Sequence, residues 1–155
     1  MKISNEVKRK IFLKPTHYFF FCLILSFAAY SMLPSMNWIK FPWNLLGIIL
    51  IASGIYFIYA SYALLKKHKT AVSFEKSTHL VTEGVYKYST NPMYFGAFVF
   101  LLGVSILVGN IVSFASPAIF FLVINYMFIP YEEEKGEIEF GKEYIKYKEE
   151  TKKWI

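Results

Sequence analysis

The sequence predicts an all-α integral membrane protein, with four transmembrane helices and a C-terminal interfacial helical tail. Two observations carry this prediction. The 155-residue chain is 55% hydrophobic and 20% aromatic, values above those typical of soluble domains. Its 16 Phe and 12 Tyr suit a bilayer with aromatic belts at its two interfaces. A chain of this length is expected to form a single domain, residues 1–155.

The first apolar run, residues 18–33, is short and dense and ends before Pro34. A secretory signal is the alternative, because the run follows a basic start and carries small residues at Ala28 and Ala29. We favour a retained span, since cleavage there would leave one basic segment on the outer side of the membrane.

The remaining apolar runs give three further spans. Residues 45–65 have about the twenty-residue length that a helix needs to cross the hydrocarbon core. Residues 94–108 and 111–129 are separated only by the turn-forming pair Gly109 and Asn110, so they are expected to form an antiparallel hairpin. The third span is short for a full crossing.

The basic residues predict the orientation. Sixteen of the 17 precede the first span, lie between the second and third, or follow the fourth, and Lys40 alone lies elsewhere. The positive-inside rule then places both termini and loop 66–93 on the cytoplasmic side. The membrane is expected to be the cell (inner) membrane. Basic segments beside spans favour anionic lipid headgroups as partners rather than nucleic acid.

The tail, residues 130–155, is strongly charged and is expected to be helical. It carries eight Glu and six Lys from Glu132 onward. Gly136 and Gly141 are expected to divide it into two helical pieces. An apolar flank on the membrane interface is expected from Ile138, Tyr144, Ile145, Tyr147 and Trp154.

The stretch from Leu80 to Gly96 holds candidate binding residues directly before the third span. Asn91-Pro92 breaks the chain there, and the backbone N–H groups of the helix start behind it suit a carboxylate or phosphate. Tyr86, Tyr88 and Tyr94 offer ring faces that attract organic cations. An aromatic belt at headgroup level is the alternative for each tyrosine.

Three glutamates, Glu132, Glu133 and Glu134, begin where the fourth span is predicted to end. The dipole of a helix C-terminus disfavours negative charge, so these residues need lysine partners, water or a bound cation. We expect one of the first two to face a cationic ligand; the alternative is a solvated acidic turn.

Other chemistries find little support. Cys22 stands alone in an apolar run, and the three His lack metal-ligand spacing, so no metal site is expected. Neither a Gly-rich phosphate loop nor a catalytic triad is recognisable. Asn125, a polar residue in the fourth span, is expected to form a hydrogen bond between helices.

Two motifs carry a family resemblance. The first is formed by Leu80, Val81, Gly84, Tyr86, Asn91, Pro92, Tyr94 and Gly96. The second is formed by Glu132, Glu133, Phe140, Gly141, Tyr144 and Tyr147. The two motifs occur in this order on either side of a two-span hairpin. With them, the sequence resembles the isoprenylcysteine carboxyl methyltransferase family, particularly its small bacterial members, which are related to phospholipid methyltransferases.

The resemblance implies an S-adenosyl-L-methionine-dependent methyltransferase with a lipid-soluble or amphiphilic acceptor. The cofactor contacts that it implies are Thr78, His79, Leu80, Val81, Tyr86, Asn91, Pro92, Met93, Tyr94 and Glu132. Methyl transfer needs alignment and a dry site more than acid–base groups, so the missing triad does not oppose an enzyme.

The sequence also departs from the family pattern. Thr90 stands where an arginine is usual, Gly136 replaces a leucine, and Phe128 stands where eukaryotic members place an arginine that meets the substrate carboxylate. These departures favour one alternative, a non-catalytic relative that serves as a membrane binding or assembly partner. A second alternative is an NADPH-dependent reductase similar to the membrane sterol reductases, which share this C-terminal architecture. The cofactor that stabilises the protein discriminates among these functions.

Overall fold

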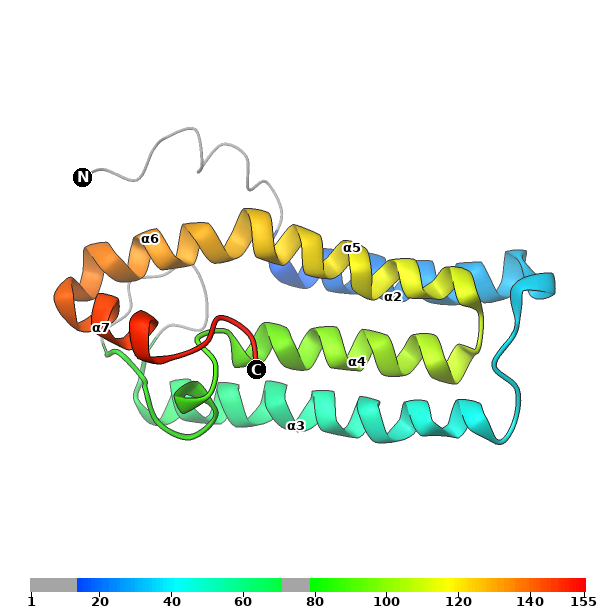
Figure 1. Cartoon of the computed structure of the whole chain (residues 1–155), viewed down its shortest axis with the longest axis horizontal. Coiled ribbons are helices and arrows are strands. Elements are labelled where there is room, and N and C mark those ends of the chain that lie inside the picture. Colours follow the sequence, from blue (N-terminus) through cyan, green and yellow to red (C-terminus); the bar gives the residue numbers. More distant parts are fainter. Residues whose placement is uncertain (1–13, 71–78) are drawn as a thin grey trace.

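The computed structural model describes residues 14–70 and 79–155. In this part of the chain the structure is helical, without a strand (Figure 1). The α-helices are α2 (Pro15–Met32), α3 (Leu46–Lys67), α4 (Pro92–Val108), α5 (Ala115–Val123), α6 (Ile129–Phe140) and α7 (Lys142–Glu150). The shorter helical turns are η1 (Pro34–Met36), η2 (Trp43–Leu45), η3 (Gly84–Lys87), η4 (Ile111–Phe114) and the π turn η5 (Ile124–Phe128).

Three helical segments of the described chain are long and apolar enough to cross a membrane, namely Pro15–Met32, Trp43–Lys67 and Ile111–Phe140. The fourth apolar helix, α4, has 17 residues and lies antiparallel to α3 along its length (Figure 1). At 1.5 Å per residue it reaches about 25 Å, a little less than the hydrocarbon core. The predicted class, an all-α membrane protein, is confirmed.

Two helices begin earlier than the hydropathy of the sequence predicts. α2 begins at Pro15 rather than at residue 18, and α4 begins at Pro92 rather than at residue 94. Proline suits the first helical position because its missing N–H would have no partner there. In both places the residues between the proline and the predicted apolar run are also helical.

The predicted end of the fourth span at residue 129 is wrong as a helix boundary. The helix continues through Pro130 to Phe140. The π turn η5, in which the N–H of Ile129 bonds to the carbonyl of Ile124, directly precedes the proline and accommodates it. Glu132 to Glu134 therefore lie inside a helix, and the unfavourable C-terminal dipole inferred for them does not apply.

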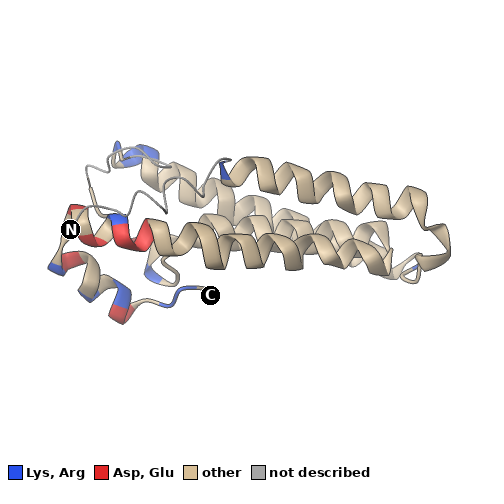
Figure 2. Cartoon of the chain, turned by 90° about the horizontal axis from the view of Figure 1, so that it is seen from above, with Lys and Arg blue, Asp and Glu red and all other residues tan. Residues whose placement is uncertain are grey.

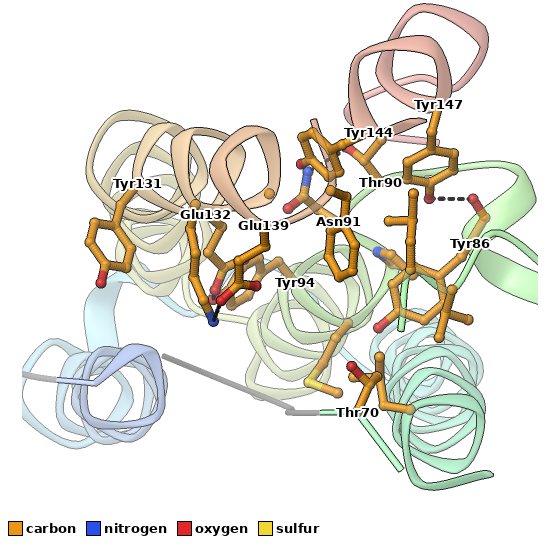
Figure 3. A pocket seen from close by; sticks show the side chains of 18 of the residues that line it. Thr70, Tyr86, Thr90, Asn91, Tyr94, Tyr131, Glu132, Glu139, Tyr144 and Tyr147 are labelled. Atoms are coloured by element: carbon orange, nitrogen blue, oxygen red, sulfur yellow. Dashed lines mark hydrogen bonds and ion pairs between the residues drawn. The ribbon is translucent and has the colours of Figure 1, made fainter. Parts of the chain in front are cut away.

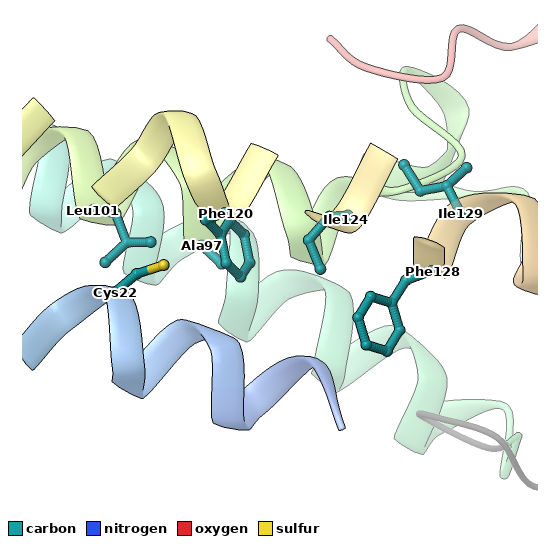
Figure 4. Close-up of a cluster of buried hydrophobic side chains, with 7 residues drawn as sticks. All are labelled: Cys22, Ala97, Leu101, Phe120, Ile124, Phe128 and Ile129. Carbon is teal, nitrogen blue, oxygen red and sulfur yellow. The ribbon is translucent and has the colours of Figure 1, made fainter. Parts of the chain in front are cut away.

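The core lies between α2, α4 and the α5–η5 segment (Figure 4). Its buried members are Cys22, Ala97, Leu101, Phe120, Ile124, Phe128 and Ile129. Phe128 is fully buried and packs edge-on against Tyr18, with ring centroids 5.6 Å apart. The side chain at this position therefore belongs to the apolar core of the bundle.

The α4–α5 hairpin was predicted from Gly109 and Asn110 and is confirmed. Gly109 adopts a left-handed φ of 77°, and its carbonyl accepts hydrogen bonds from Trp38 and Ile39. Asn110 is fully buried, and its Nδ2 donates to the carbonyls at the end of α2. These bonds join the α2–α3 connection to the hairpin.

Charged residues gather at the opposite end of the bundle, around α6, α7 and the ends of α2 and α3 (Figure 2). Lys40, in the α2–α3 connection, lies away from them. The bundle thus has one charged end and long apolar sides.

Candidate functional site

A pocket of about 490 Å³ opens at the charged end of the bundle (Figure 3). The start of α4, α6, α7, the segment before α4 and the adjoining ends of α2 and α3 form its walls. The predicted site residues found among its lining are His79, Leu80, Val81, Tyr86, Asn91, Pro92, Met93, Tyr94 and Glu132. Thr78 lies outside the described residues. The structure thus brings nine residues together, and their role in cofactor binding stays a prediction.

The start of α4 forms one wall. Asn91 is the N-cap residue and is buried, and Pro92 occupies the first helical position. The hydroxyl of Ser89, itself buried, accepts a hydrogen bond from the Asn91 backbone N–H at 3.0 Å. The first turn of a helix leaves its N–H groups without intrahelical partners, and the dipole favours negative charge there. This wall therefore suits an anionic group of a ligand.

Glu132 of α6 faces α4 across the pocket. The hydroxyl of Tyr94 donates a hydrogen bond to Glu132 Oε1 at 2.6 Å. This contact joins the two predicted motifs, which lie 38 residues apart in the sequence. A carboxylate held in a pocket wall lined by aromatic rings attracts a cationic group.

Further charges on α6 were missed by the sequence analysis. Lys135 and Glu139 line the same pocket, and Lys135 Nζ lies 3.9 Å from Glu139 Oε1. Their side chains are only 14% and 15% exposed. Both residues stand one or two turns beyond Glu132, on the same helix face. The helical spacing of these two residues from Glu132 could have identified them, but this spacing has meaning only if the helix continues past residue 129.

Gly136 was expected to interrupt the tail, and this expectation is wrong. α6 runs through it and ends at Phe140, and the break comes at Gly141, whose φ is +56°. A Cβ on Gly136 would lie 2.6 Å from the Tyr144 ring. Gly136 therefore allows Tyr144 of α7 to pack closely on α6 at the pocket.

Tyrosines complete the lining. The Tyr147 hydroxyl donates to the Tyr86 carbonyl at 2.6 Å, and Tyr144 stands beside it in the pocket wall (Figure 3). The predicted lipid-facing flank is thus wrong for Tyr144 and Tyr147, whereas Ile138 and Ile145 are exposed.

Burial, together with the negative charge of Glu132, raises the pKa of Tyr86 above its ordinary value. Burial also raises the pKa of Tyr144, where Glu133 and Glu132 add to the effect. Both phenols therefore stay protonated at neutral pH. They can donate hydrogen bonds and present neutral ring faces to a cation.

The segment before α4 is tied to α3 by an exposed charge cluster. Glu83 Oε1 lies 2.8 Å from Lys67 Nζ and 2.9 Å from His68 Nε2. The hydrogen bonds from Lys67 and then His68 lower the Glu83 pKa from 4.5 to about 2. A carboxyl group whose pKa is lowered by folding stabilises the fold at pH values above its unfolded-state pKa. This contribution is lost as the pH falls through its folded-state pKa.

We expect Glu83→Gln to lower the unfolding temperature slightly at pH 6, and the difference from wild type to vanish as the pH falls from 4.5 to 2. Because the pair is exposed, 1 M salt should shrink the difference at pH 6. Thermal unfolding of both proteins across this pH range is the measurement. A difference that persists at low pH would show that the carboxylate charge is not its cause.

The described chain is thus a helical membrane protein with a tyrosine- and carboxylate-lined pocket at its charged end. The family model for phospholipid methyltransferases matches residues 43–142, and the chain belongs to that family. The predicted family relationship is confirmed. The matched region contains all ten predicted site residues.

Relatives of the chain include two plant proteins and one bacterial protein. Protein-S-isoprenylcysteine O-methyltransferases B and A of Arabidopsis thaliana are each 34% identical, over 84 and 86 residues. These matches cover 52% and 53% of this chain but 41% and 42% of the relatives, so the chain spans about two fifths of their length. An uncharacterized protein of Haemophilus influenzae is 36% identical over 63 residues, which are 41% of this chain and 100% of that protein. No solved structure matches the chain.

Proposed function

We propose that the protein is a membrane methyltransferase that uses S-adenosyl-L-methionine and acts on a lipid-soluble or amphiphilic acceptor. The observation that carries the proposal is that residues of both motifs line one pocket, in which the Tyr94 hydroxyl donates a hydrogen bond to Glu132. The family membership and the names of the plant relatives support it.

The pocket fits this cofactor in size and in chemistry. Its volume of about 490 Å³ lies in the range of roughly 300–1,000 Å³ usual for small-molecule sites. Glu132 and the ring faces of Tyr86 and Tyr94 match a cationic sulfur and an ammonium group. The start of α4 matches the methionine carboxylate, because the N–H groups of a first helical turn bind anions.

S-adenosyl-L-methionine supplies a methyl group on a cationic sulfur. In this proposal the residues of the chain bind and orient the two reactants. Glu132 holds the cationic part of the cofactor by charge, and Tyr94 keeps that carboxylate in place. The rings of Tyr86, Tyr144 and Tyr147 exclude water from the pocket, where alignment and desolvation lower the barrier.

The acceptor is proposed only by class. Phe128 occupies the core, so its position offers no cationic anchor for a substrate carboxylate. The pocket lies where the apolar helices end, so an amphiphile can reach it from the bilayer while the cofactor arrives from water. We further propose one domain, residues 1–155, in the inner membrane with the charged end and both termini in the cytoplasm.

Thermal unfolding of the purified protein in nanodiscs tests the proposal. At one hundred times its dissociation constant, S-adenosyl-L-methionine or S-adenosylhomocysteine should add about 2.7 kcal/mol of stability. NADPH serves as the control ligand. A shift with NADPH alone would favour a reductase, and the absence of a shift with all three ligands would favour a non-catalytic relative.

A further inference from the structure

We infer that the segment Thr151–Ile155, here named the strap, positions Asn91 and thereby sets the affinity of the pocket for its cofactor. The inference rests on the proposed function, because the ligand is the proposed one. The strap follows α7 and runs back toward the start of α4 (Figure 1). None of its residues lines the pocket.

Backbone carbonyls of the strap hold the segment that leads into α4. The Thr90 N–H donates to the Lys152 carbonyl at 2.9 Å. The Lys153 carbonyl accepts from Ser89 Oγ at 3.0 Å and from Asn91 Nδ2 at 3.3 Å. Three consecutive residues at the pocket edge are therefore fixed by two consecutive residues of the strap.

Side chains anchor the strap to the membrane helices. The Trp154 indole N–H donates to Asn125 Oδ1 at 3.2 Å, and its ring lies 5.0 Å from that of Phe121. Lys153 Nζ lies 3.3 Å from Glu133 Oε1 on α6. The predicted helix–helix role of Asn125 is thus wrong, because its partner is the strap. Trp154 couples the pocket edge to α5 and the π turn η5.

The bonds to Asn91 determine which end of its amide a ligand meets. Nδ2 donates to the Lys153 carbonyl and, at 2.8 Å, to Thr90 Oγ1. With both amide protons engaged by the protein, Oδ1 is the atom left to accept a hydrogen bond from an N–H or O–H of the ligand. Loss of the strap would free the amide to rotate and present a donor instead.

Trp154→Ala tests the inference, with Trp154→Phe and Lys152→Ala as companion variants. Trp154→Ala removes the anchor on α5 and η5 and should weaken S-adenosyl-L-methionine binding about tenfold, the loss expected from one hydrogen bond and one aromatic pair that order the site. Trp154→Phe keeps the ring contact and should recover most of the affinity. The side chain of Lys152 is exposed, and Lys152 contacts the pocket edge through its backbone carbonyl, which alanine retains, so Lys152→Ala should bind as wild type does.

Amide hydrogen exchange of the ligand-free proteins gives a readout that needs no cofactor. The Thr90 amide should exchange faster in Trp154→Ala than in wild type or Lys152→Ala, while the amides of α3 exchange unchanged. Unchanged Thr90 exchange, or unchanged affinity in Trp154→Ala, would overturn the inference. If Trp154→Ala does not fold, Trp154→Phe decides it, because this variant loses the hydrogen bond to Asn125. Its Thr90 amide should then exchange faster than that of Lys152→Ala, and equal exchange in the two variants would overturn the inference. A wild-type protein that binds no adenosyl ligand would overturn the proposed function, and the exchange data would still test the strap.

Discussion

Glu132→Gln is expected to weaken binding of S-adenosyl-L-methionine by roughly 100-fold, the largest effect of a single change in the pocket. Glutamine has the same shape and can still accept the hydrogen bond from Tyr94, whose hydroxyl lies 2.6 Å from Glu132 Oε1. The substitution therefore removes the charge and little else. At an effective dielectric of 20, an ion pair at 4 Å is worth about 4 kcal/mol, of which desolvation offsets a part.

Comparison of two ligands isolates the role of the charge. S-adenosylhomocysteine has a neutral sulfur, so Glu132→Gln should weaken its binding less than that of S-adenosyl-L-methionine. Isothermal titration of both ligands into wild type and variant is the measurement. Glu134→Gln is the matched control, because it makes the same chemical change on the same helix at a residue outside the pocket lining. Equal losses in the two variants would refute the assignment of Glu132.

Glu132→Gln should not reduce the stability of the ligand-free protein. A partly buried carboxylate costs desolvation energy, and neutralising it while keeping its hydrogen bond removes that cost. We therefore expect the unfolding temperature without ligand to stay the same or rise. A fall would mean that the charge of Glu132 stabilises the fold rather than a ligand.

Much of the fold could be predicted because it depends on local composition. The apolar runs gave the helices, and Gly109-Asn110 gave the hairpin, since a left-handed glycine and a buried asparagine are local requirements of that turn. The continuation of the last helix through Pro130 was missed. Its cause is the π turn η5, a change of hydrogen-bond register that leaves no clear mark in the sequence.

The unpredicted continuation of the last helix also explains which site residues could be predicted and which could not. Asn91, Tyr94 and Glu132 were identified by motif, and a motif can be recognised without knowing where the helices begin and end. Lys135 and Glu139 could be placed only after the helix was known to continue. The strap was missed for another reason: its bonds to Thr90 and Asn91 use backbone carbonyls, and a backbone contact between distant segments imposes no residue type.

The packing of α3 on α4 depends on glycines that face each other. A Cβ on Gly54 would lie 2.6 Å from the Gly96 carbonyl oxygen and 2.7 Å from the Phe100 backbone nitrogen. Gly47 and Gly103 meet in the same way one heptad further along both helices. Small residues let membrane helices approach closely and gain van der Waals contact along their length. Because backbone atoms form the opposing surface, a larger side chain cannot be accommodated by a rotamer change.

Gly54→Leu should therefore force the two helices apart and destabilise the protein by about 3 kcal/mol or more, at the upper end of overpacking effects. Ala52→Leu is the control, because Ala52 lies on the exposed face of the same helix; it should change stability by less than about 0.5 kcal/mol. Thermal unfolding of the three proteins in the same nanodiscs measures the difference.

Separation of α3 from α4 should also reach the pocket. The end of α3 contributes Leu65 to its lining, and the start of α4 contributes Asn91 to Tyr94. A wider gap between these walls leaves their contacts with a ligand incomplete, so Gly54→Leu should lose most of the stabilisation by S-adenosyl-L-methionine that wild type and Ala52→Leu show. If Gly54→Leu unfolds at the temperature of Ala52→Leu, the helices tolerate the added side chain, and the close glycine contact is not what holds the pocket walls together.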